Sequence, residues 1–316
     1  MRFDEFMERA LYDPQHGFYE SAQAGRRRGH FITNPEVGPL FGAVLAQMLD
    51  RRWQELGRPD PFIVVDAGAG PGTLARTVIK AEPICTPTMH WINVERSATG
   101  RSSHTSGQSM PAMPKGPLTG VIMANELLDN LPLRLLGPND TDIDEHRPDP
   151  KTLLTPRQDQ ACAWLSQALT ILEAGTVLVI DYMSTTENMA SRPWAQWLRT
   201  YRDHQRGNDP WAAPGSQDIT CEVALDQLSA VRTPTRINNQ ATWLKAHGIN
   251  ELVAEGTNAW RSGAAQGNLS ALAGRSRATE AEALLDPCGL GAFTVAEWDV
   301  PETQYNAQNK RCPTQS

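Results

Sequence analysis

The stretch that decides the fold is VVDAGAGPGTLAR, residues 64–76. It closes a short apolar run, 61–66, of the kind typical of a strand buried on both faces, and it continues through glycines into a segment with helical spacing. Three more apolar runs of strand length follow at 90–95, 120–125 and 176–181, with helix-like segments among them. Strands that alternate with helices in this way predict an α/β fold with a doubly wound, mostly parallel sheet.

The glycines of this stretch fall at Gly68, Gly70 and Gly72. A dinucleotide-binding turn needs a glycine where Thr73 stands, and a nucleoside triphosphate loop needs a Gly-Lys-Ser/Thr that is absent. Glycine lets the backbone approach a ligand closely and take positive φ angles. We therefore predict a ligand-binding turn of another kind; the alternative is a tight turn with no ligand.

Acids lie at the ends of the first two predicted strands. Asp66 closes the first strand and Glu95 the second, 27 residues after Gly68. Ligands of open α/β sheets bind outside the carboxyl ends of the strands, where an acid can accept both hydroxyls of a ribose. An adenosine-type ligand with positive charge and no phosphate fits this pattern, and S-adenosyl-L-methionine is such a ligand. The alternative for Glu95 is a surface acid.

The third strand ends in GVIMANELLDNLP, residues 120–132, with Asn125, Glu126 and Asp129 as candidate catalytic residues. Glu126 and Asp129 stand three residues apart, so a helical turn would place both on one face. Two carboxylates could hold a guanidinium and orient it, whereas a nucleobase acceptor is disfavoured because no tyrosine follows the amide. The alternative is structural: Asn125 caps a following helix whose first turn carries the acids.

Further candidates lie downstream. Asp181 and Tyr182 end the fourth strand and reach the same edge of the sheet, where a sheet-end hydrogen bond is an equally good explanation. His204 and Asp218 could line an acceptor pocket, against a structural alternative for each.

The chain divides by pattern. An apolar stripe from Val37 to Leu56 predicts a long helix, with Asn34 as its N-cap and Pro35 as its first residue. The expected units are a helical N-terminal cap (1–60), a ligand-binding core (61–183), an insertion and substrate-side region (184–290), a late strand that completes the sheet (291–301) and a flexible tail (302–316).

The composition excludes several classes of protein. The net charge of −7 argues against nucleic-acid binding. The five cysteines are odd in number and none lie in a CxxC pair, so we expect neither a disulfide framework nor a metal site. No apolar stretch approaches the ~20 residues of a membrane span. We expect a cytoplasmic protein; a homodimer stays open.

Seven segments in order carry a family resemblance: FMERALYDPQHGFY, FITNPEVGPLFG, VVDAGAGPGTLAR, VERS, MANELLDNLP, VLVIDY and PGSQDIT. Together they resemble the MidA-like S-adenosyl-L-methionine-dependent methyltransferases, relatives of the mitochondrial assembly factor that methylates an arginine of a respiratory complex I subunit. The resemblance implies a Rossmann-like class I methyltransferase core with a helical N-terminal cap. The predicted cofactor-binding residues are Asp66, Gly68, Ala69, Gly70, Gly72, Glu95 and Thr33.

Two departures from the family pattern stand out. His30 replaces an acid that the family usually carries between the corresponding glycine and phenylalanine. The stretch 97–113 is polar and rich in glycine, so the helix after the second strand should be short. Three functions are open: a protein arginine methyltransferase, which we favour, a small-molecule O- or N-methyltransferase, and a cofactor-binding assembly factor without turnover. The methyl acceptor is thus a protein arginine or a small molecule.

Overall fold

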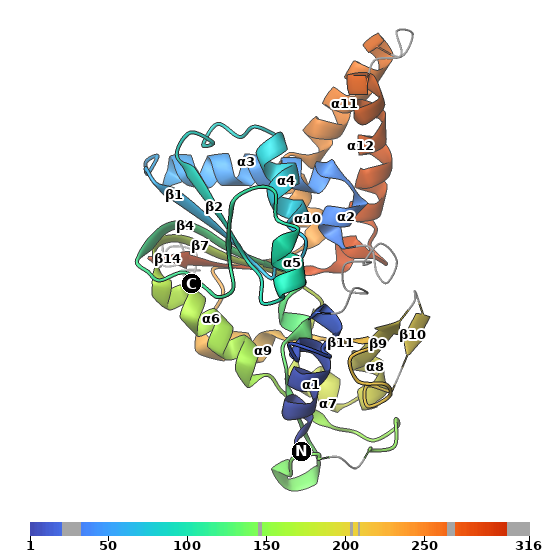
Figure 1. The fold of residues 1–316 in the computed structure, drawn as a ribbon. Coiled ribbons are helices and arrows are strands. Elements are labelled where there is room, and N and C mark those ends of the chain that lie inside the picture. Colours follow the sequence, from blue (N-terminus) through green and yellow to red (C-terminus); the bar gives the residue numbers. More distant parts are fainter. Residues whose placement is uncertain (21–32, 145–146, 203–204, 208, 264–268, 302–316) are drawn as a thin grey trace, which may run out of the picture.

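A seven-stranded sheet forms the centre of the protein in a computed structural model, which describes residues 1–20, 33–144, 147–202, 205–207, 209–263 and 269–301 (Figure 1). The strand order is β13-β14-β7-β4-β1-β2-β3. Their bounds are β1 Phe62–Ala67, β2 Met89–Val94, β3 Gln108–Met110, β4 Leu118–Asn125, β7 Leu172–Asp181, β13 Arg236–Asn239 and β14 Thr294–Val300. Strands β3, β2, β1, β4 and β7 are parallel, and β14 runs antiparallel to both β7 and β13.

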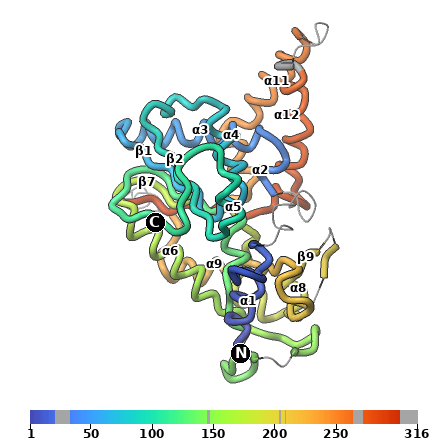
Figure 2. The backbone as a smooth tube through the Cα atoms, in the orientation of Figure 1, coloured from blue at the N-terminus to red at the C-terminus, as the bar shows by residue number. Residues whose placement is uncertain are grey.

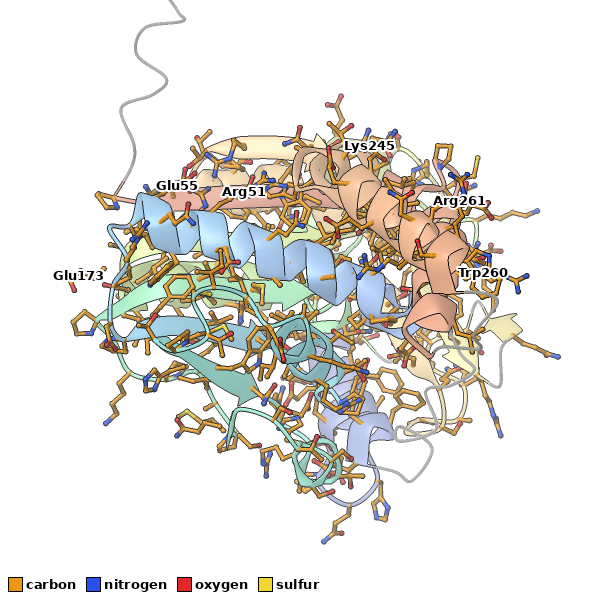
Figure 3. The ribbon with its side chains drawn as sticks, turned by 90° about the horizontal axis from the view of Figure 1, so that it is seen from above. Arg51, Glu55, Glu173, Lys245, Trp260 and Arg261 are labelled. Atoms are coloured by element: carbon orange, nitrogen blue, oxygen red, sulfur yellow. The ribbon has the colours of Figure 1, made fainter. Side chains whose placement is uncertain are left out.

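The sheet is covered on both faces, which explains its continuous apolar strands. Val64 packs into a core with α3 (Pro39–Glu55), α4 (Thr73–Lys80) and α10 (Gln240–Ala246). Val65, its neighbour, points to the opposite face, where α6 (Asp159–Ile171) and α9 (Leu225–Val231) pack. Figure 3 shows α3 lying over the sheet, with the exposed residues Arg51 and Glu55 on its outer surface. The predicted doubly wound α/β fold is therefore confirmed. Strand β14 falls within the segment 291–301, where a late strand is expected.

The helix predicted to begin at Asn34 is two helices. α2 covers Asn34–Val37 with Thr33 as its N-cap, and α3 begins at Pro39. The break falls at Gly38, because the helical conformation is disfavoured for a residue that precedes proline. The position suits glycine, since a Cβ there would collide with the carboxylate of Glu280. The expectation that Asn34 is the N-cap is wrong: its side chain is fully buried and makes tertiary contacts instead.

A second hydrophobic core lies beyond the carboxyl edge of the sheet. It joins α1 (Phe3–Tyr12) to residues of the region 189–224, among them α8 (Trp194–Trp197), β9 (Leu198–Arg202) and β11 (Asp218–Cys221). Phe3 and Trp194 both contact the ring of Trp211 in this core. The first 60 residues thus serve both cores, because α1 packs here while α3 packs on the sheet. The expected tail 302–316 lies outside the described residues.

Two long helices form an arm that projects from the sheet domain (Figures 1 and 2). They are α11 (Ile249–Gly263) and α12 (Leu269–Leu285), and they approach each other closely at Gly256 and Gly274. Trp260 and Arg261 lie on this arm in Figure 3. At its base, the buried Glu280 of α12 accepts a hydrogen bond from the backbone N–H of Leu40 at 2.8 Å, which ties the arm to the start of α3.

The remaining elements are short. The α5 helix after β2 spans only Ala98–Ser102, as the polar stretch 97–113 predicts. The others are η1 Phe18–Glu20, η3 Leu128–Asn130, β5 Arg134–Leu136, η4 Pro138–Asp140, β6 Thr155–Arg157, β8 Met183–Ser184, α7 Thr186–Ala190, β10 Gln205–Gly207, β12 Val223–Ala224 and η6 Leu290–Ala292. Across the described ranges, the helices are too short or too polar to cross a bilayer.

Gly120 is expected to be essential for stability, because its φ is +152° and a Cβ there would collide with the carbonyl oxygen of Ile63 on β1. Backbone cannot move aside as a side chain can. Gly120→Ala should therefore lower the free energy of unfolding by roughly 1–3 kcal/mol or more, measured by urea unfolding. Gly57→Ala is the control, since Gly57 has a φ of +80° but no neighbour within 4 Å. Equal losses in the two variants would show that the contact with Ile63 is unimportant.

Candidate active site

Four neighbouring parallel strands carry an acid at their carboxyl ends. Along the sheet these are Asp181 on β7, Glu126 after β4, Asp66 on β1 and Glu95 after β2. The strands are parallel, so all four side chains emerge at one edge of the sheet, where ligands of open α/β folds bind. The edge therefore concentrates negative charge in a partly buried place, and each carboxylate needs donors or cations around it.

The glycine turn is held by Glu95. The backbone N–H of Gly70 donates to Oε2 of Glu95 at 2.9 Å, and the N–H of Ser97 donates to Oε1 at 2.8 Å. Gly68 and Gly70 have φ angles of +73° and +52°, which favour glycine. A Cβ at Gly68 would also lie 2.8 Å from Cδ1 of Leu127. Gly68 and Gly70 thus allow the left-handed backbone of the turn, and Gly68 also allows its close packing against Leu127.

The sequence analysis missed one residue that supports this turn. Nε2 of His104 lies 2.9 Å from the carbonyl oxygen of Gly70, and its Nδ1 lies 2.8 Å from Oγ of Ser109. A single histidine in a polar stretch gives no sequence signal for such a contact. His104 therefore contacts the carbonyl group of Gly70, while Glu95 accepts a hydrogen bond from the N–H group of the same residue.

Asp66 is the unsatisfied member of the four acids. Its residue is 3% exposed, and within the described part of the chain its Oδ2 has no hydrogen-bond partner. Burial, with a smaller contribution from the charge of Glu95, raises the pKa of Asp66 to about 7. A buried carboxylate without a donor is unfavourable, so this oxygen marks the place where a cationic ligand would be stabilised.

The turn after β4 differs from the expectation. Glu126 has a φ of +53°, so it is not helical, and Asp129 lies in the 3₁₀ turn η3, whose N-cap is Leu127. The predicted helical turn with Glu126 and Asp129 on one face is wrong, and so is the alternative of Asn125 as a helix cap. Oε1 of Glu126 instead accepts from the backbone N–H of Asn34 at 3.0 Å and from Nδ2 of Asn125 at 3.1 Å.

Asp181 fixes this turn from the neighbouring strand. Its Oδ2 accepts from the backbone N–H groups of Leu128 at 3.0 Å and Asp129 at 3.3 Å, and its Oδ1 accepts from the backbone N–H of Tyr182 at 2.8 Å. Burial raises the pKa of Asp181 and the charge of Glu126 raises it further, while these three donors act in the opposite direction. Of the two explanations offered by the sequence, Asp181 thus makes the sheet-end hydrogen bonds.

Two adjoining pockets open at this edge. The acidic pocket is lined by the carboxylates Glu36, Asp66, Glu126, Asp129, Asp218 and Glu222. The apolar pocket lies beside Glu95 and is lined by Ala67, Val94, Met113, Leu127, Leu131 and Trp164. Gly68, Glu126 and Asn130 line both pockets, so a single elongated ligand could occupy the two together.

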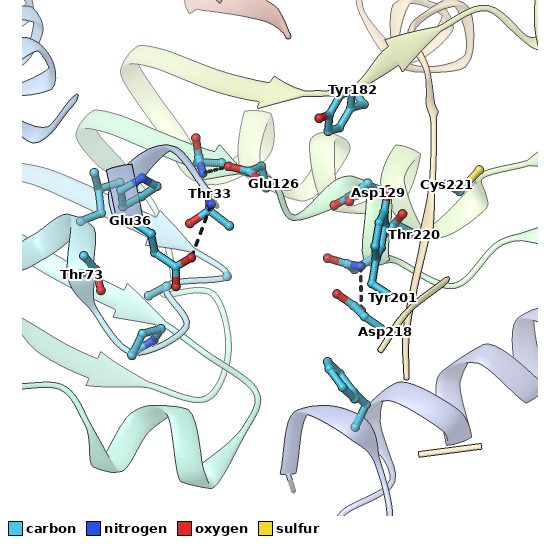
Figure 4. A pocket seen from close by; sticks show the side chains of 18 of the residues that line it. Thr33, Glu36, Thr73, Glu126, Asp129, Tyr182, Tyr201, Asp218, Thr220 and Cys221 are labelled. Carbon is cyan, nitrogen blue, oxygen red and sulfur yellow. Dashed lines mark hydrogen bonds between the residues drawn. The ribbon is translucent and has the colours of Figure 1, made fainter. Parts of the chain in front are cut away.

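Figure 4 shows the acidic pocket between two walls. Thr33, Glu36, Thr73 and Glu126 lie on one side; Asp129, Tyr182, Tyr201, Asp218 and Thr220 lie on the other. The predicted residues Thr33, Asp66, Gly68, Ala69, Asn125, Glu126 and Asp129 all line this pocket. Glu95 lines the apolar pocket, and Gly70 and Gly72 lie in the turn itself. His204 and His30 lie outside the described residues.

The second core supplies the far wall of the acidic pocket. Oδ1 of Asp218 accepts from Oη of Tyr19 at 2.8 Å and from Nδ2 of Asn130 at 3.2 Å, which connects β11 to the N-terminal segment and to η3. On the same wall, Nη2 of Arg199 donates to Oε1 of Glu222 at 2.9 Å, with its guanidinium 6.0 Å from the ring of Tyr182. Sequence reasoning missed Arg199 and Glu222, because isolated charges in an irregular segment carry no pattern.

A doubly wound sheet with a glycine turn and strand-end acids at its carboxyl edge is the architecture of a Rossmann-like nucleoside-binding enzyme. A family model of S-adenosyl-L-methionine-dependent methyltransferases matches residues 44–151 and 157–242. The chain belongs to this family, which confirms the MidA-like resemblance and makes S-adenosyl-L-methionine its cofactor.

Partial relatives agree with this assignment, and a solved structure shares the fold. The mitochondrial protein arginine methyltransferase NDUFAF7 homologue of Drosophila melanogaster is 42% identical over 76 residues, which are 24% of this chain and 17% of that protein. The human NDUFAF7 protein is 32% identical over 76 residues, with the same coverage of 24% and 17%. A Burkholderia thailandensis protein crystallised with S-adenosyl-homocysteine shares the fold, with a TM-score of 0.74 and 24% identity over 95% of this chain and 87% of its own.

We expect the affinity for S-adenosyl-L-methionine to fall as the pH is lowered from 7 to 5. Asp66, with a pKa of about 7 in the free protein, becomes protonated in this range and loses the charge that a ligand ammonium needs. The limiting slope is about tenfold per pH unit. Calorimetric titration across the range measures it, and Asp66→Asn should abolish the slope. A pH-independent affinity in the parent protein would exclude Asp66 from the cofactor contacts.

Asp66→Asn should also stabilise the free protein at pH 8. The pKa of Asp66 is raised from 3.8 to about 7 on folding, so its stabilising contribution is present below pH 4 and is lost as the pH rises through 7. Removal of the charge should raise the free energy of unfolding by a few kcal/mol, because each pKa unit is worth about 1.4 kcal/mol. Urea unfolding at pH 8 and pH 4 tests this. A variant that is less stable at pH 8 would contradict it.

Proposed function

We propose that this methyltransferase acts on the side chain of a protein arginine. The observation that carries the proposal is the acidic pocket, which gathers six carboxylates and the rings of Tyr182 and Tyr201 beside the cofactor edge. A guanidinium is planar and permanently charged, and it is recognised by carboxylates and aromatic faces. An acidic pocket with tyrosine walls suits this acceptor better than a neutral small molecule.

The residues of the edge fit the cofactor. Asp66, whose buried oxygen has no donor within the described residues, would hold the ammonium group. Gly68 and Ala69 line the acidic pocket at the turn, and Glu95 would accept the ribose hydroxyls, since a carboxylate has about four acceptor positions. The apolar pocket would take the adenine. When bound, S-adenosyl-L-methionine supplies a methyl group on a positively charged sulfur.

The chain itself contributes position and orientation. Glu126 and Asp129 approach the acidic pocket from the turn after β4 and would accept the guanidinium N–H groups, which sets the direction of the reacting nitrogen. Asn125 holds the carboxylate of Glu126 at 3.1 Å. Correct orientation of two reactants can supply up to roughly 7–11 kcal/mol of the barrier. The nitrogen that takes the methyl group from sulfur must also release a proton, which the carboxylate of Glu126 or Asp129 would accept.

Two further observations support an arginine acceptor. The pocket wall already accommodates one guanidinium, since Arg199 pairs with Glu222 near the ring of Tyr182. The partial relatives named above are arginine methyltransferases, although their match covers 24% of this chain. The phenol of Tyr182 stays neutral, because burial and then the charge of Glu126 raise its pKa, so it can donate a hydrogen bond in the pocket.

Glu126→Gln and Asp129→Asn should each lower turnover by roughly 100-fold or more, the scale of a positioned acid or base, while cofactor affinity and melting temperature stay nearly unchanged. Turnover is measured as the transfer of labelled methyl groups from S-adenosyl-L-methionine to proteins in a lysate of the cells from which the protein comes. Glu55→Gln is the control, because Glu55 is an exposed acid on α3 with 60% side-chain exposure.

The location of the label separates the three functions. Label on protein arginine supports the proposal. Label in small molecules alone would replace it with a small-molecule methyltransferase, and cofactor binding without any labelled product would replace it with an assembly factor. Parental turnover in both carboxylate variants would show that Glu126 and Asp129 do not orient the acceptor.

A further inference from the structure

A chain of buried amides reaches the active-site turn from outside the two pockets. We propose that Gln240 and Asn34 are positioning residues, which hold Glu126 through hydrogen bonds that all donate toward its carboxylate. The proposal rests on the role given to Glu126 under the proposed function. Neither residue touches the acceptor; each acts through Asn125 and Glu126.

The contacts run in one direction across three parts of the fold. Nε2 of Gln240, on α10, donates to Oδ1 of Asn34 at 2.6 Å. Nδ2 of Asn34, on α2, donates to Oδ1 of Asn125 at 3.0 Å, and Nδ2 of Asn125 donates to Oε1 of Glu126 at 3.1 Å. The backbone N–H of Asn34 adds a second hydrogen bond to the same Oε1 at 3.0 Å.

The carboxylate sets this direction. An ionised carboxylate only accepts, so Asn125 must present its NH₂ group to Glu126. Its oxygen then faces Asn34 and requires a donor there, and the oxygen of Asn34 in turn requires a donor from Gln240. The charge of Glu126 therefore orders the whole chain, and the chain in turn favours one orientation of the Glu126 carboxylate.

Burial shows that these amides have a specific role. Asn34 and Gln240 are both 0% exposed. Oε1 of Gln240 has no hydrogen-bond partner within the described residues, whereas its NH₂ group meets two acceptors, Asn34 and the carbonyl oxygen of Leu284 at 3.4 Å. An unpaired buried carbonyl is unfavourable, and an apolar side chain of the same length would avoid it. The presence of a glutamine at position 240 is explained by the hydrogen bond that its NH₂ group donates to Asn34.

The conformation of Glu126 explains why such support is needed. Its φ of +53° is unusual for a residue with a side chain, and such conformations persist only when the surroundings determine them. Asp181 fixes the following residues from β7, and the amide chain fixes Glu126 from α2 and α10. Two sets of hydrogen bonds thus converge on one strained turn.

The test uses Gln240→Met, which keeps the length and removes the donor, with Gln227→Met as the matched control. Gln227 on α9 also donates two hydrogen bonds, to Pro156 and Thr186, in a part of the fold away from the chain. With S-adenosyl-homocysteine bound, the affinity of Gln240→Met for acetyl-arginine amide should fall roughly tenfold, while its affinity for S-adenosyl-homocysteine stays unchanged. Gln227→Met should leave both affinities at the parent values. A parent affinity for the arginine probe in Gln240→Met would overturn the proposal.

A second readout does not depend on the acceptor or on the folding of Gln240→Met. In ¹⁵N-labelled Glu126→Gln, loss of the charge should shift the side-chain amide resonances of Asn125, Asn34 and Gln240 together, with those of Gln227 and Gln158 unchanged. Unshifted resonances of Asn34 and Gln240 would show that these amides are not connected to Glu126 through hydrogen bonds. If the parent protein fails to bind the arginine probe, the labelling experiment still decides the arginine proposal, and the resonances decide whether the amides hold Glu126.

Discussion

The gathering of four carboxylates, two buried and two half-buried, at one edge of the sheet is the constraint on which the rest of the structure depends. Asp181, Glu126, Asp66 and Glu95 emerge side by side because their strands are parallel and adjacent. Buried charges of one sign repel and lose hydration, so each must be compensated locally. The surrounding elements supply hydrogen-bond donors to these carboxylates.

Three of the four carboxylates are each compensated by a different set of hydrogen-bond donors. Glu95 takes the N–H groups of the glycine turn, Asp181 takes those of the turn after β4, and Glu126 takes a backbone N–H and an amide that reach it from α2 and β4. Of these four, Asp66 is the one with a buried oxygen that has no donor among the described residues. The fold thus satisfies three of these acids by itself, and we propose that the fourth receives the ammonium group of the ligand.

Local patterns in the sequence predicted the sheet, the glycine turn and the strand-end acids, because the burial of a strand and the conformation of a turn depend on residues that are close together in the sequence. The prediction for Glu126 and Asp129 was wrong in its geometry, since spacing cannot show that one residue adopts a left-handed conformation. Contacts between distant segments could not be predicted either: Gln240 with Asn34, and Asp218 with Tyr19, are joined only by the tertiary fold. Asn34 illustrates both limits, because its sequence pattern indicates a cap while its buried side chain donates a hydrogen bond to Asn125 at the end of β4.

The most direct test is a crystal structure of the protein with S-adenosyl-homocysteine. The ligand is expected to span the two pockets, with its amine at hydrogen-bond distance from Oδ2 of Asp66, its ribose hydroxyls at Glu95 and its adenine beside Met113 and Leu127. A ligand bound elsewhere, or one whose amine lies away from Asp66, would show that the unsatisfied carboxylate at the sheet edge does not define the cofactor site.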